Sequence, residues 1–277
     1  MNIKVKTDSY KHIVFDRYYP DDDKTNSLPK VIMIHGMCGG AWYFKQMASF
    51  LAGKGLDSYV PDLRGHGRSA YYDVGSIEDY VEDVRKVAEF VYKQHNVPMV
   101  FMGHSMGGLV TQKFTAMFPE LVKGIVLLTS APPKGISVLT PLVIRKMIKH
   151  MPSIVFNRYL YFTKNDCFSL ILNNFDKNDP EAESAAIKIM RTPESGKAAR
   201  ELAFSLIPVD ERKINCPILV VSGVLDKIVP ISTQLKIKEK YSFSDYFQFE
   251  RGHMLMLERG WEEVISKIYD WINLNSI

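Results

Sequence analysis

The stretch PMVFMGHSMGGLV, residues 98–110, decides the fold because it joins a short apolar run to a helical pattern. At the junction, GHSMG (103–107) fits G-x-S-x-G, the sharp strand-to-helix turn known as a nucleophile elbow. Gly103 and Gly107 fit this turn, because a side chain two residues from the serine would collide with the neighbouring strand or helix. We therefore predict that Ser105 exposes its hydroxyl at the head of a helix.

A serine hydroxyl is a weak nucleophile unless a base takes its proton, so this prediction requires a histidine and a carboxylate. In this architecture the chain order is Ser, then Asp or Glu, then His, with each residue in a loop after a late strand. Asp226 follows the apolar run PILVVSG, and His253 follows DYFQFE. Asp210 and Asp245 are weaker candidates because each precedes its strand. The predicted catalytic triad is Ser105, Asp226 and His253.

Acyl transfer also requires backbone N–H donors that bind the oxyanion, which together form an oxyanion hole. Met106 follows the nucleophile and supplies the first donor. The second is expected in HGMCGG (35–40), where Gly36 ends the strand and the Met37 amide is the predicted donor. We expect the neighbouring Cys38 to line the pocket.

The other histidines near these motifs have less direct roles. We expect His104 to pack and hydrogen-bond inside the elbow, His66 to shape a loop near the site, and His35 to orient the oxyanion turn. No histidine lies near a second His, Cys or carboxylate at metal-ligand spacing. We therefore expect neither a metal nor a cofactor.

Short β-rich runs alternate with helical patterns along most of the chain, which is typical of βαβ units and a mainly parallel sheet. Strands are predicted at residues 11–19, 31–35, 57–63, 98–103, 124–130, 217–223 and 245–250. Helices are predicted at 41–53, 77–95, 106–117, 232–241 and 260–273. Ser76 and Asp79 predict the capping box of the second helix. Residues 20–29, PDDDKTNSLP, predict a turn-rich link.

This alternation stops after Pro132 and resumes after about Lys213. In between, DPE (179–181) and TPE (192–194) each predict a helix start, because a capping residue precedes a proline at the first helical position. Apolar side chains that can supply pocket walls are Met147, Met151, Phe156, Tyr161, Phe162, Phe168, Leu170, Phe175, Met190 and Phe204. The predicted organisation is a core domain of residues 1–131 and 214–277 with a helical cap, or lid, of residues 132–213.

Composition narrows the functional class. The 277 residues are 46% hydrophobic and 24% charged, and the net charge of +4 is spread without a basic block, so nucleic acid is not an expected partner. The three cysteines are far apart and predict neither a disulfide framework nor a zinc site. With no apolar run long enough for a signal peptide or a membrane helix, we expect a cytoplasmic protein without an integral membrane segment. No oligomeric state is predicted.

In the order HGMCGGAW, DLRGHGRS, GHSMGG, SGVLDKIVP and RGHMLML, the chain resembles the α/β-hydrolase superfamily from about Lys30 to Ile272. The resemblance implies an eight-stranded, mostly parallel sheet, with a cap inserted after the sixth strand above the triad. HGMCGGAW and GHMLML resemble the esterase and lipase-like branch that includes plant methylesterases and hydroxynitrile lyases. SAPPKG and TPESGKAARELAF are similar to bacterial lysophospholipase-like hydrolases. Epoxide hydrolases and haloalkane dehalogenases are disfavoured, because they carry aspartate where this chain has Ser105.

The predicted function is a serine hydrolase, of the serine esterase or lipase type, that cleaves carboxylic esters of hydrophobic or lipid-like small molecules through an acyl-enzyme. Three alternatives stay open. One is a thioesterase or carbon–carbon bond hydrolase with the same triad, and another is a lyase of the cyanohydrin type. The third is a ligand-binding protein that keeps the hydrolase fold with negligible turnover.

Overall fold

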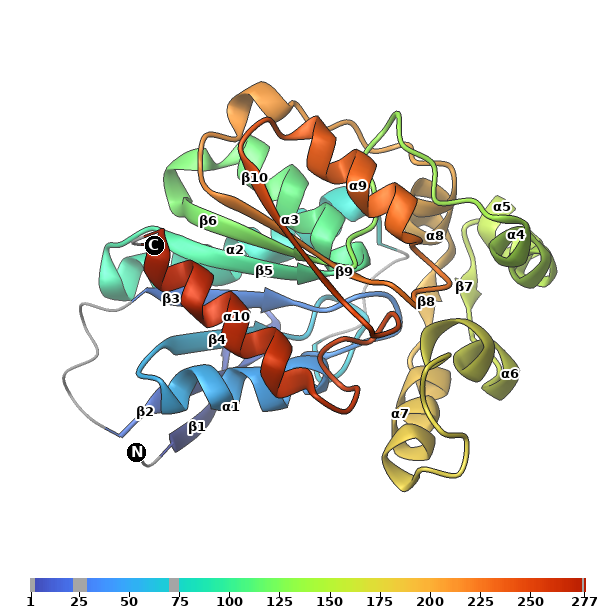
Figure 1. Cartoon of the computed structure of the whole chain (residues 1–277), viewed down its shortest axis with the longest axis horizontal. Helices are drawn as coiled ribbons and strands as arrows, with labels where there is room; N and C mark the ends of the chain where they lie inside the picture. The colour runs from blue at the N-terminus through green and yellow to red at the C-terminus, as the bar shows by residue number, and fades with distance from the viewer. Residues whose placement is uncertain (1–2, 22–28, 70–74, 276) are drawn as a thin grey trace.

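A single large β-sheet organises the computed structural model of this protein, which describes residues 3–21, 29–69, 75–275 and 277 (Figure 1). Within these residues the sheet has eight strands in the order β1-β2-β4-β3-β5-β6-β9-β10. They are β1 (Ile3–Tyr10), β2 (Ile13–Pro20), β3 (Lys30–Ile34), β4 (Asp57–Pro61), β5 (Met99–His104), β6 (Val122–Leu128), β9 (Ile218–Gly223) and β10 (Ser244–Phe249). The pairs β1–β2 and β2–β4 are antiparallel, and the other pairs are parallel. The expectation of an eight-stranded, mostly parallel sheet is confirmed.

The central strands form because apolar runs bury side chains on both faces of the sheet. Every residue of β3 is buried, and successive residues point to opposite faces. Val31 and Met33 join the apolar core that contains α1 (Lys45–Gly53) and α10 (Trp261–Leu274), which pack side by side (Figure 1). Ile32 and Ile34 join the core on the other face. That core contains α2 (Ile77–His95), α3 (Met106–Met117) and α9 (Ile231–Lys240).

The helices of the sheet region begin and end close to their predicted limits. The 3-10 turn η2 (Ala41–Phe44) precedes α1, and η3 (Pro119–Leu121) follows α3. The predicted capping box of α2 is confirmed: the Ser76 hydroxyl accepts from the Asp79 amide at 3.2 Å, and the Asp79 carboxylate accepts from the Ser76 amide at 2.7 Å. None of the helices in the described ranges combines the length and apolar character that a bilayer crossing requires.

Strand β1 is absent from the sequence-based prediction. Its side chains are mostly exposed, and its only partner in the described sheet is β2, so it carries no buried apolar face to reveal it. The strand predicted at residues 11–19 instead begins at Ile13, because Lys11 and His12 have positive φ angles of 49° and 70° and form the two-residue hairpin turn. Residues 22–28 of the predicted turn-rich link lie outside the described residues.

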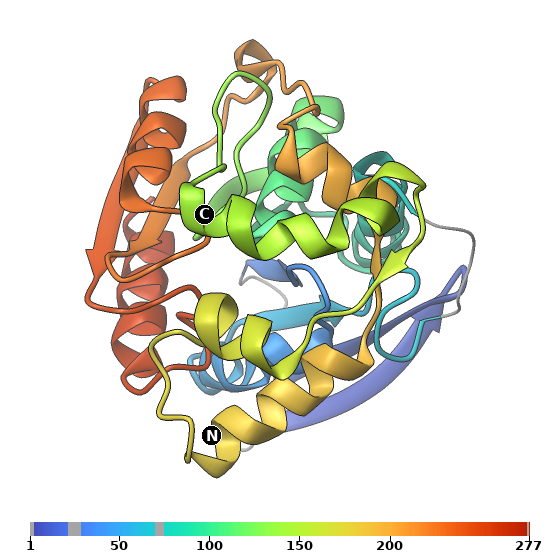
Figure 2. The same cartoon turned by 90° about the vertical axis from the view of Figure 1, so that its right-hand side faces the viewer.

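Between β6 and β9 the chain leaves the sheet, and we call residues 132–213 the inserted segment. It lies beyond the carboxyl ends of the central strands, on the right in Figure 1 and toward the viewer in Figure 2. Its helices are α4 (Pro141–Met147), η4 (Ile148–His150), α5 (Met151–Val155), α6 (Lys164–Asp166), η5 (Cys167–Ile171), α7 (Pro180–Arg191), α8 (Gly196–Ala203) and η6 (Glu211–Lys213). The short strands β7 (Tyr159–Leu160) and β8 (Glu194–Ser195) pair antiparallel.

One of the two helix starts predicted in this segment is correct. Asp179 caps α7, accepting from the Glu181 amide at 2.9 Å. The start predicted at residues 192–194 is wrong, because this stretch follows the end of α7 and leads into β8. The following helix, α8, is capped by Ser195, whose hydroxyl accepts from the Ala198 amide at 3.2 Å. The Glu194 side chain is buried and bonds to the sheet region instead of capping a helix.

Candidate active site

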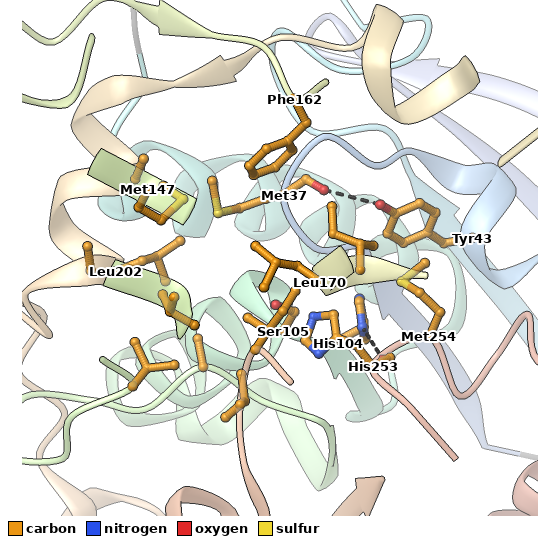
Figure 3. A pocket seen from close by; sticks show the side chains of 18 residues that line it. Met37, Tyr43, His104, Ser105, Met147, Phe162, Leu170, Leu202, His253 and Met254 are labelled. Atoms are coloured by element: carbon orange, nitrogen blue, oxygen red, sulfur yellow. Dashed lines mark hydrogen bonds between the residues drawn. The ribbon is translucent and has the colours of Figure 1, made fainter. Parts of the chain in front are cut away.

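Ser105 occupies a strained turn between the last residue of β5 and the first residue of α3. Its φ angle is +53°, which is uncommon for a residue with a side chain and indicates backbone strain held by the surrounding fold. The flanking glycines permit this turn. A Cβ on Gly103 would overlap the carbonyl oxygen of Gly107, and a Cβ on Gly107 would overlap the carbonyl oxygen of Ile34. The turn directs Ser105 to the wall of a pocket (Figure 3).

Asp226 and His253 are brought together from the loops that follow β9 and β10. The imidazole Nδ1 of His253 donates to Asp226 Oδ2 at 2.8 Å, and both side chains are buried. The other carboxylate oxygen accepts from the backbone amides of Ile228 at 2.8 Å and Val229 at 3.0 Å. The carboxylate is therefore held by its own loop. Among the described residues, the His253 side chain is hydrogen-bonded to Asp226 alone, which leaves Nε2 without a protein partner.

The backbone carbonyl of His253 is held by two side chains at the carboxyl ends of neighbouring strands, the last residue of β5 and the residue after β6. His104 Nε2 and the hydroxyl of Thr129 each donate to it at 3.0 Å. Burial, together with the nearby His253 ring, keeps the pKa of His104 well below its ordinary value. His104 therefore acts as a neutral donor here, in line with the hydrogen-bonding role expected from the sequence. Thr129 carries no motif and was not identified from the sequence.

The oxyanion turn predicted at HGMCGG lies directly against the elbow. The Gly39 amide donates to the Gly36 carbonyl at 3.2 Å, and a Cβ on Gly36 would lie 3.0 Å from the Cβ of Ser105. The Tyr43 hydroxyl donates to the Met37 carbonyl at 3.1 Å (Figure 3). The first predicted donor, the Met106 amide, is the first N–H of α3 and has no acceptor within the helix. Met106 thus directly follows Ser105, and Met37 lines the same pocket as Ser105.

His35 ties the start of this turn to the loop after β4. Its Nδ1 donates to the Gly36 carbonyl at 2.8 Å, while Nε2 accepts from the Leu63 amide at 3.1 Å. The ring is therefore neutral, and burial together with the neighbouring His66 lowers the pKa of His35 to about 4. The expectation that Cys38 lines the pocket is wrong. Its side chain is fully buried in the apolar core, and it is absent from the pocket wall.

The pocket in front of Ser105 and His253 has a volume of about 100 Å³ (Figure 3). It is lined by Met37, Tyr43, His104, Ser105, Ala131, Val138, Val143, Met147, Phe162, Leu170, Ile171, Ala199, Leu202, Ala203, Ile228, Val229, His253 and Met254. None of these lining residues is Asp, Glu, Lys or Arg. Of the apolar side chains expected as pocket walls, Met147, Phe162 and Leu170 line it, whereas Phe156, Tyr161 and Phe204 are at least half exposed.

Among the known proteins that this chain resembles in sequence or structure are lipases and esterases. The sequence model of the family described as serine aminopeptidase S33 matches residues 25–250. Monoacylglycerol lipase of Mycolicibacterium smegmatis is 26% identical over 280 residues, covering 94% of this chain and 92% of that protein. The structure of a monoacylglycerol lipase from Paleococcus ferrophilus superposes with a TM-score of 0.67 at 18% identity. That of a thermophilic esterase from Thermogutta terrifontis superposes with a TM-score of 0.70 at 20% identity. Each structural match covers 98% of both chains.

Proposed function

Because the chain belongs to the serine aminopeptidase S33 family of α/β hydrolases, we propose that it is a serine hydrolase that cleaves carboxylic esters of hydrophobic, lipid-like molecules. The observation that carries this proposal is the hydrogen-bonded pair of Asp226 and His253 beside Ser105, at a pocket without charged walls. The similarity to a monoacylglycerol lipase over nearly the whole chain supports the same reaction class.

In the proposed mechanism, the Ser105 hydroxyl attacks the ester carbonyl while Nε2 of His253 takes its proton. Asp226 keeps the imidazole in the tautomer that leaves Nε2 free to act as a base. The backbone N–H groups of Met37 and Met106 bind the oxyanion of the tetrahedral intermediate. His253 then protonates the departing alcohol. Water, deprotonated by the same imidazole, releases the acid and restores Ser105.

The pocket wall favours an ester over a peptide, although the family description refers to an aminopeptidase. An aminopeptidase binds a charged amino terminus, which requires an acidic partner in a buried site. The residues that line this pocket include no Asp or Glu, and the nearby carboxylate of Asp226 is bound to His253 and two backbone amides. An uncharged acyl or alcohol group fits these surroundings better.

The inserted segment is proposed to act as a cap, residues 132–213, over a core domain of residues 1–131 and 214–277. Half of the residues that line the pocket come from it, among them Phe162, Leu170 and Leu202. This contribution makes the segment the main determinant of which acyl group is accepted.

A cytoplasmic location also remains a proposal. All three cysteines are free thiols, which suits a reducing compartment. Fractionation of the source cells, followed by immunodetection, tests it.

Labelling with a fluorophosphonate tests the proposed chemistry, because such probes modify an activated serine. We expect modification at Ser105 by peptide mapping, none in Ser105→Ala, and strongly slowed labelling in His253→Ala. Labelling at another residue, or none under conditions in which a known hydrolase reacts, would contradict the proposal and favour the ligand-binding alternative.

Substrate panels separate the remaining enzymatic alternatives. We expect turnover of p-nitrophenyl esters to exceed that of acyl-CoA thioesters and of vinylogous diketones, which report thioesterase and carbon–carbon bond hydrolase activity. Trapping of a covalent acyl-serine by acid quench and mass spectrometry would exclude the cyanohydrin-type lyase, in which the serine only moves protons.

A further inference from the structure

Glu194 is a fully buried carboxylate that joins the inserted segment to the oxyanion turn. Its Oε2 accepts from the backbone amide of Cys38 at 3.1 Å and lies 3.2 Å from Nε2 of His66. Its Oε1 accepts from the Tyr80 hydroxyl at 2.8 Å and from the Ser195 amide at 2.8 Å. Four donors satisfy the acceptor capacity of an ionised carboxylate. This arrangement is costly to build in a buried place and therefore suggests a specific role.

His66 faces this carboxylate, and the positions of its neighbours require a hydrogen on each of its two ring nitrogens. Its Nδ1 lies 2.9 Å from the backbone carbonyl of Arg64, and its Nε2 faces Glu194. Both neighbours can only accept a hydrogen bond, so both ring nitrogens carry a hydrogen. Burial lowers the pKa of His66, but the charge and hydrogen bond of Glu194 outweigh this and raise it. The two side chains form a buried ion pair beneath the oxyanion turn.

The oxyanion turn is held at three successive residues, each by a different side chain. His35 binds the Gly36 carbonyl, Tyr43 binds the Met37 carbonyl, and Glu194 binds the Cys38 amide. His35 and Tyr43 belong to the sheet region, whereas Glu194 is supplied by the inserted segment, 156 residues away in the sequence. The Met37 amide lies between these held groups. The group on one side of it, the Gly36 carbonyl, is held by the sheet region, and the group on the other side, the Cys38 amide, is held by a carboxylate of the inserted segment.

We propose that Glu194 is a positioning residue for the oxyanion hole, acting through the Cys38 amide and held in place by His66. The inference rests on the proposed function, because it assigns a role in binding the oxyanion. Without the Glu194 carboxylate, the Cys38 amide and His66 lose a buried acceptor, and the turn that carries Met37 relaxes. Oxyanion binding matters mainly in the transition state, so the effect should fall on kcat more than on KM.

The test compares two buried acids of the same segment. Asp166 is also a buried acid with a histidine nearby, His150, whose Nε2 lies 3.5 Å from its carboxylate. Its hydrogen-bond partners, Lys149 and Thr163, lie within the inserted segment, as His150 does. We expect Glu194→Gln to lower kcat on p-nitrophenyl butyrate by about 10- to 100-fold, with KM changed by less than about 2-fold. Asp166→Asn should leave kcat within about 2-fold of the wild type even where its Tm falls.

The Ki of a trifluoromethyl ketone inhibitor distinguishes a role in oxyanion binding from a role in fold stability alone, because only the first would change it. The bound form of the inhibitor is a tetrahedral oxyanion adduct of the serine, so its Ki should rise in Glu194→Gln by about the same factor as kcat/KM falls. It should stay unchanged in Asp166→Asn. A Glu194→Gln enzyme with kcat and Ki within about 2-fold of the wild type would overturn the proposal.

Two further variants keep the outcome decisive. If Glu194→Gln does not fold, His66→Asn makes the same test from the sheet side, with the same expected loss of kcat and inhibitor affinity. A folded His66→Asn enzyme with both unchanged would equally overturn the proposal. Ser105→Ala monitors the proposed function separately: if it retained full turnover, the hydrolase mechanism would fail whatever Glu194 does.

Discussion

The loops at the sheet edge and the inserted segment meet at one pocket, but they hold their residues by different means. Backbone bonds fix the elbow, since the Ser105 amide donates to the Leu128 carbonyl at 3.0 Å and its carbonyl accepts from the Ala131 amide at 2.9 Å. The inserted segment reaches the same region through side chains. Asn173 donates to the Leu225 carbonyl at 2.9 Å, and Glu194 accepts from a backbone amide of the oxyanion turn.

This difference indicates that the loops at the sheet edge carry out the reaction and that the inserted segment sets substrate preference. Backbone bonds place Ser105 with little freedom, whereas the side-chain bonds of the inserted segment reach the loops around it and not the nucleophile itself. Changes at the sheet edge should therefore abolish the reaction or the fold, and changes in the inserted segment should adjust rate and substrate preference.

The largest effect is expected from Asp226→Asn, a substitution in a loop at the sheet edge. The amide cannot hold the imidazole in the same tautomer, so kcat/KM for p-nitrophenyl butyrate should fall by about 10³- to 10⁴-fold. Steady-state kinetics measure the loss, and circular dichroism confirms that the fold is intact. A loss below about tenfold in a folded enzyme would assign the acid role to another residue.

The next effect concerns the packing of the elbow, tested by Gly107→Ala. The added Cβ would overlap the Ile34 carbonyl oxygen and lie 2.6 Å from that of His35, so unfolding free energy should drop by about 3 kcal/mol or more. Gly53→Ala is the matched control, because a Cβ there meets nothing closer than 3.8 Å and lies in a helix. Urea denaturation should show the control unchanged or stabilised. Equal stability of the two variants would contradict the close packing at the elbow.

A smaller effect is expected in the inserted segment, tested by Phe162→Ala. Removing this ring enlarges the pocket, so the ratio of kcat/KM for p-nitrophenyl octanoate to that for butyrate should rise by about tenfold. Phe204→Ala, in the same segment but half exposed and away from the pocket, should leave the ratio unchanged. If both variants shift the ratio alike, the pocket is not where the acyl chain lies.

The smallest effect concerns the pH dependence of the ion pair that joins the two regions. Because the pKa of His66 is raised above its ordinary 6.5, the pair stabilises the fold fully below pH 6.5 and loses this contribution as pH rises through the higher folded value. Burial raises the pKa of Glu194, but the charge and hydrogen bond of His66, with the hydrogen bonds of Tyr80 and Ser195, outweigh it and lower the pKa, so this carboxylate stays ionised. Other titratable groups near the pair are His35, Tyr80, Asp62, Cys38 and Tyr43.

Thermal unfolding of the wild type and His66→Asn at several pH values measures this contribution. The wild type should exceed the variant in Tm by a few degrees at about pH 6, and the difference should shrink toward about pH 9. A difference that grows with pH would show that His66 is neutral in the folded protein.

The elements that could be predicted from the sequence are those with strong local patterns. The buried strands and the amphipathic helix α2 can be recognised from the periodicity of their apolar residues and from their capping residues. The elbow can be recognised from its glycines. Strand β1 could not be predicted because it has no buried apolar face, and it forms by pairing with β2. The stretch at residues 192–194 resembles a helix start, yet burial of Glu194 against the sheet region overrides that local preference.

The sequence by itself determined the central strands and the helices that cover the sheet, the elbow at Ser105, and the positions of Asp226 and His253 after late strands, because local patterns and chain order carry that information. Only the tertiary structure decided that Asp226 and His253 are in contact, that Cys38 is buried in the core and does not line the pocket, and that Glu194 meets the oxyanion turn. The physical reason is that hydrogen bonds and burial act between atoms close in space, and no pattern along the chain records which distant residues the packing of the sheet and the inserted segment brings within reach.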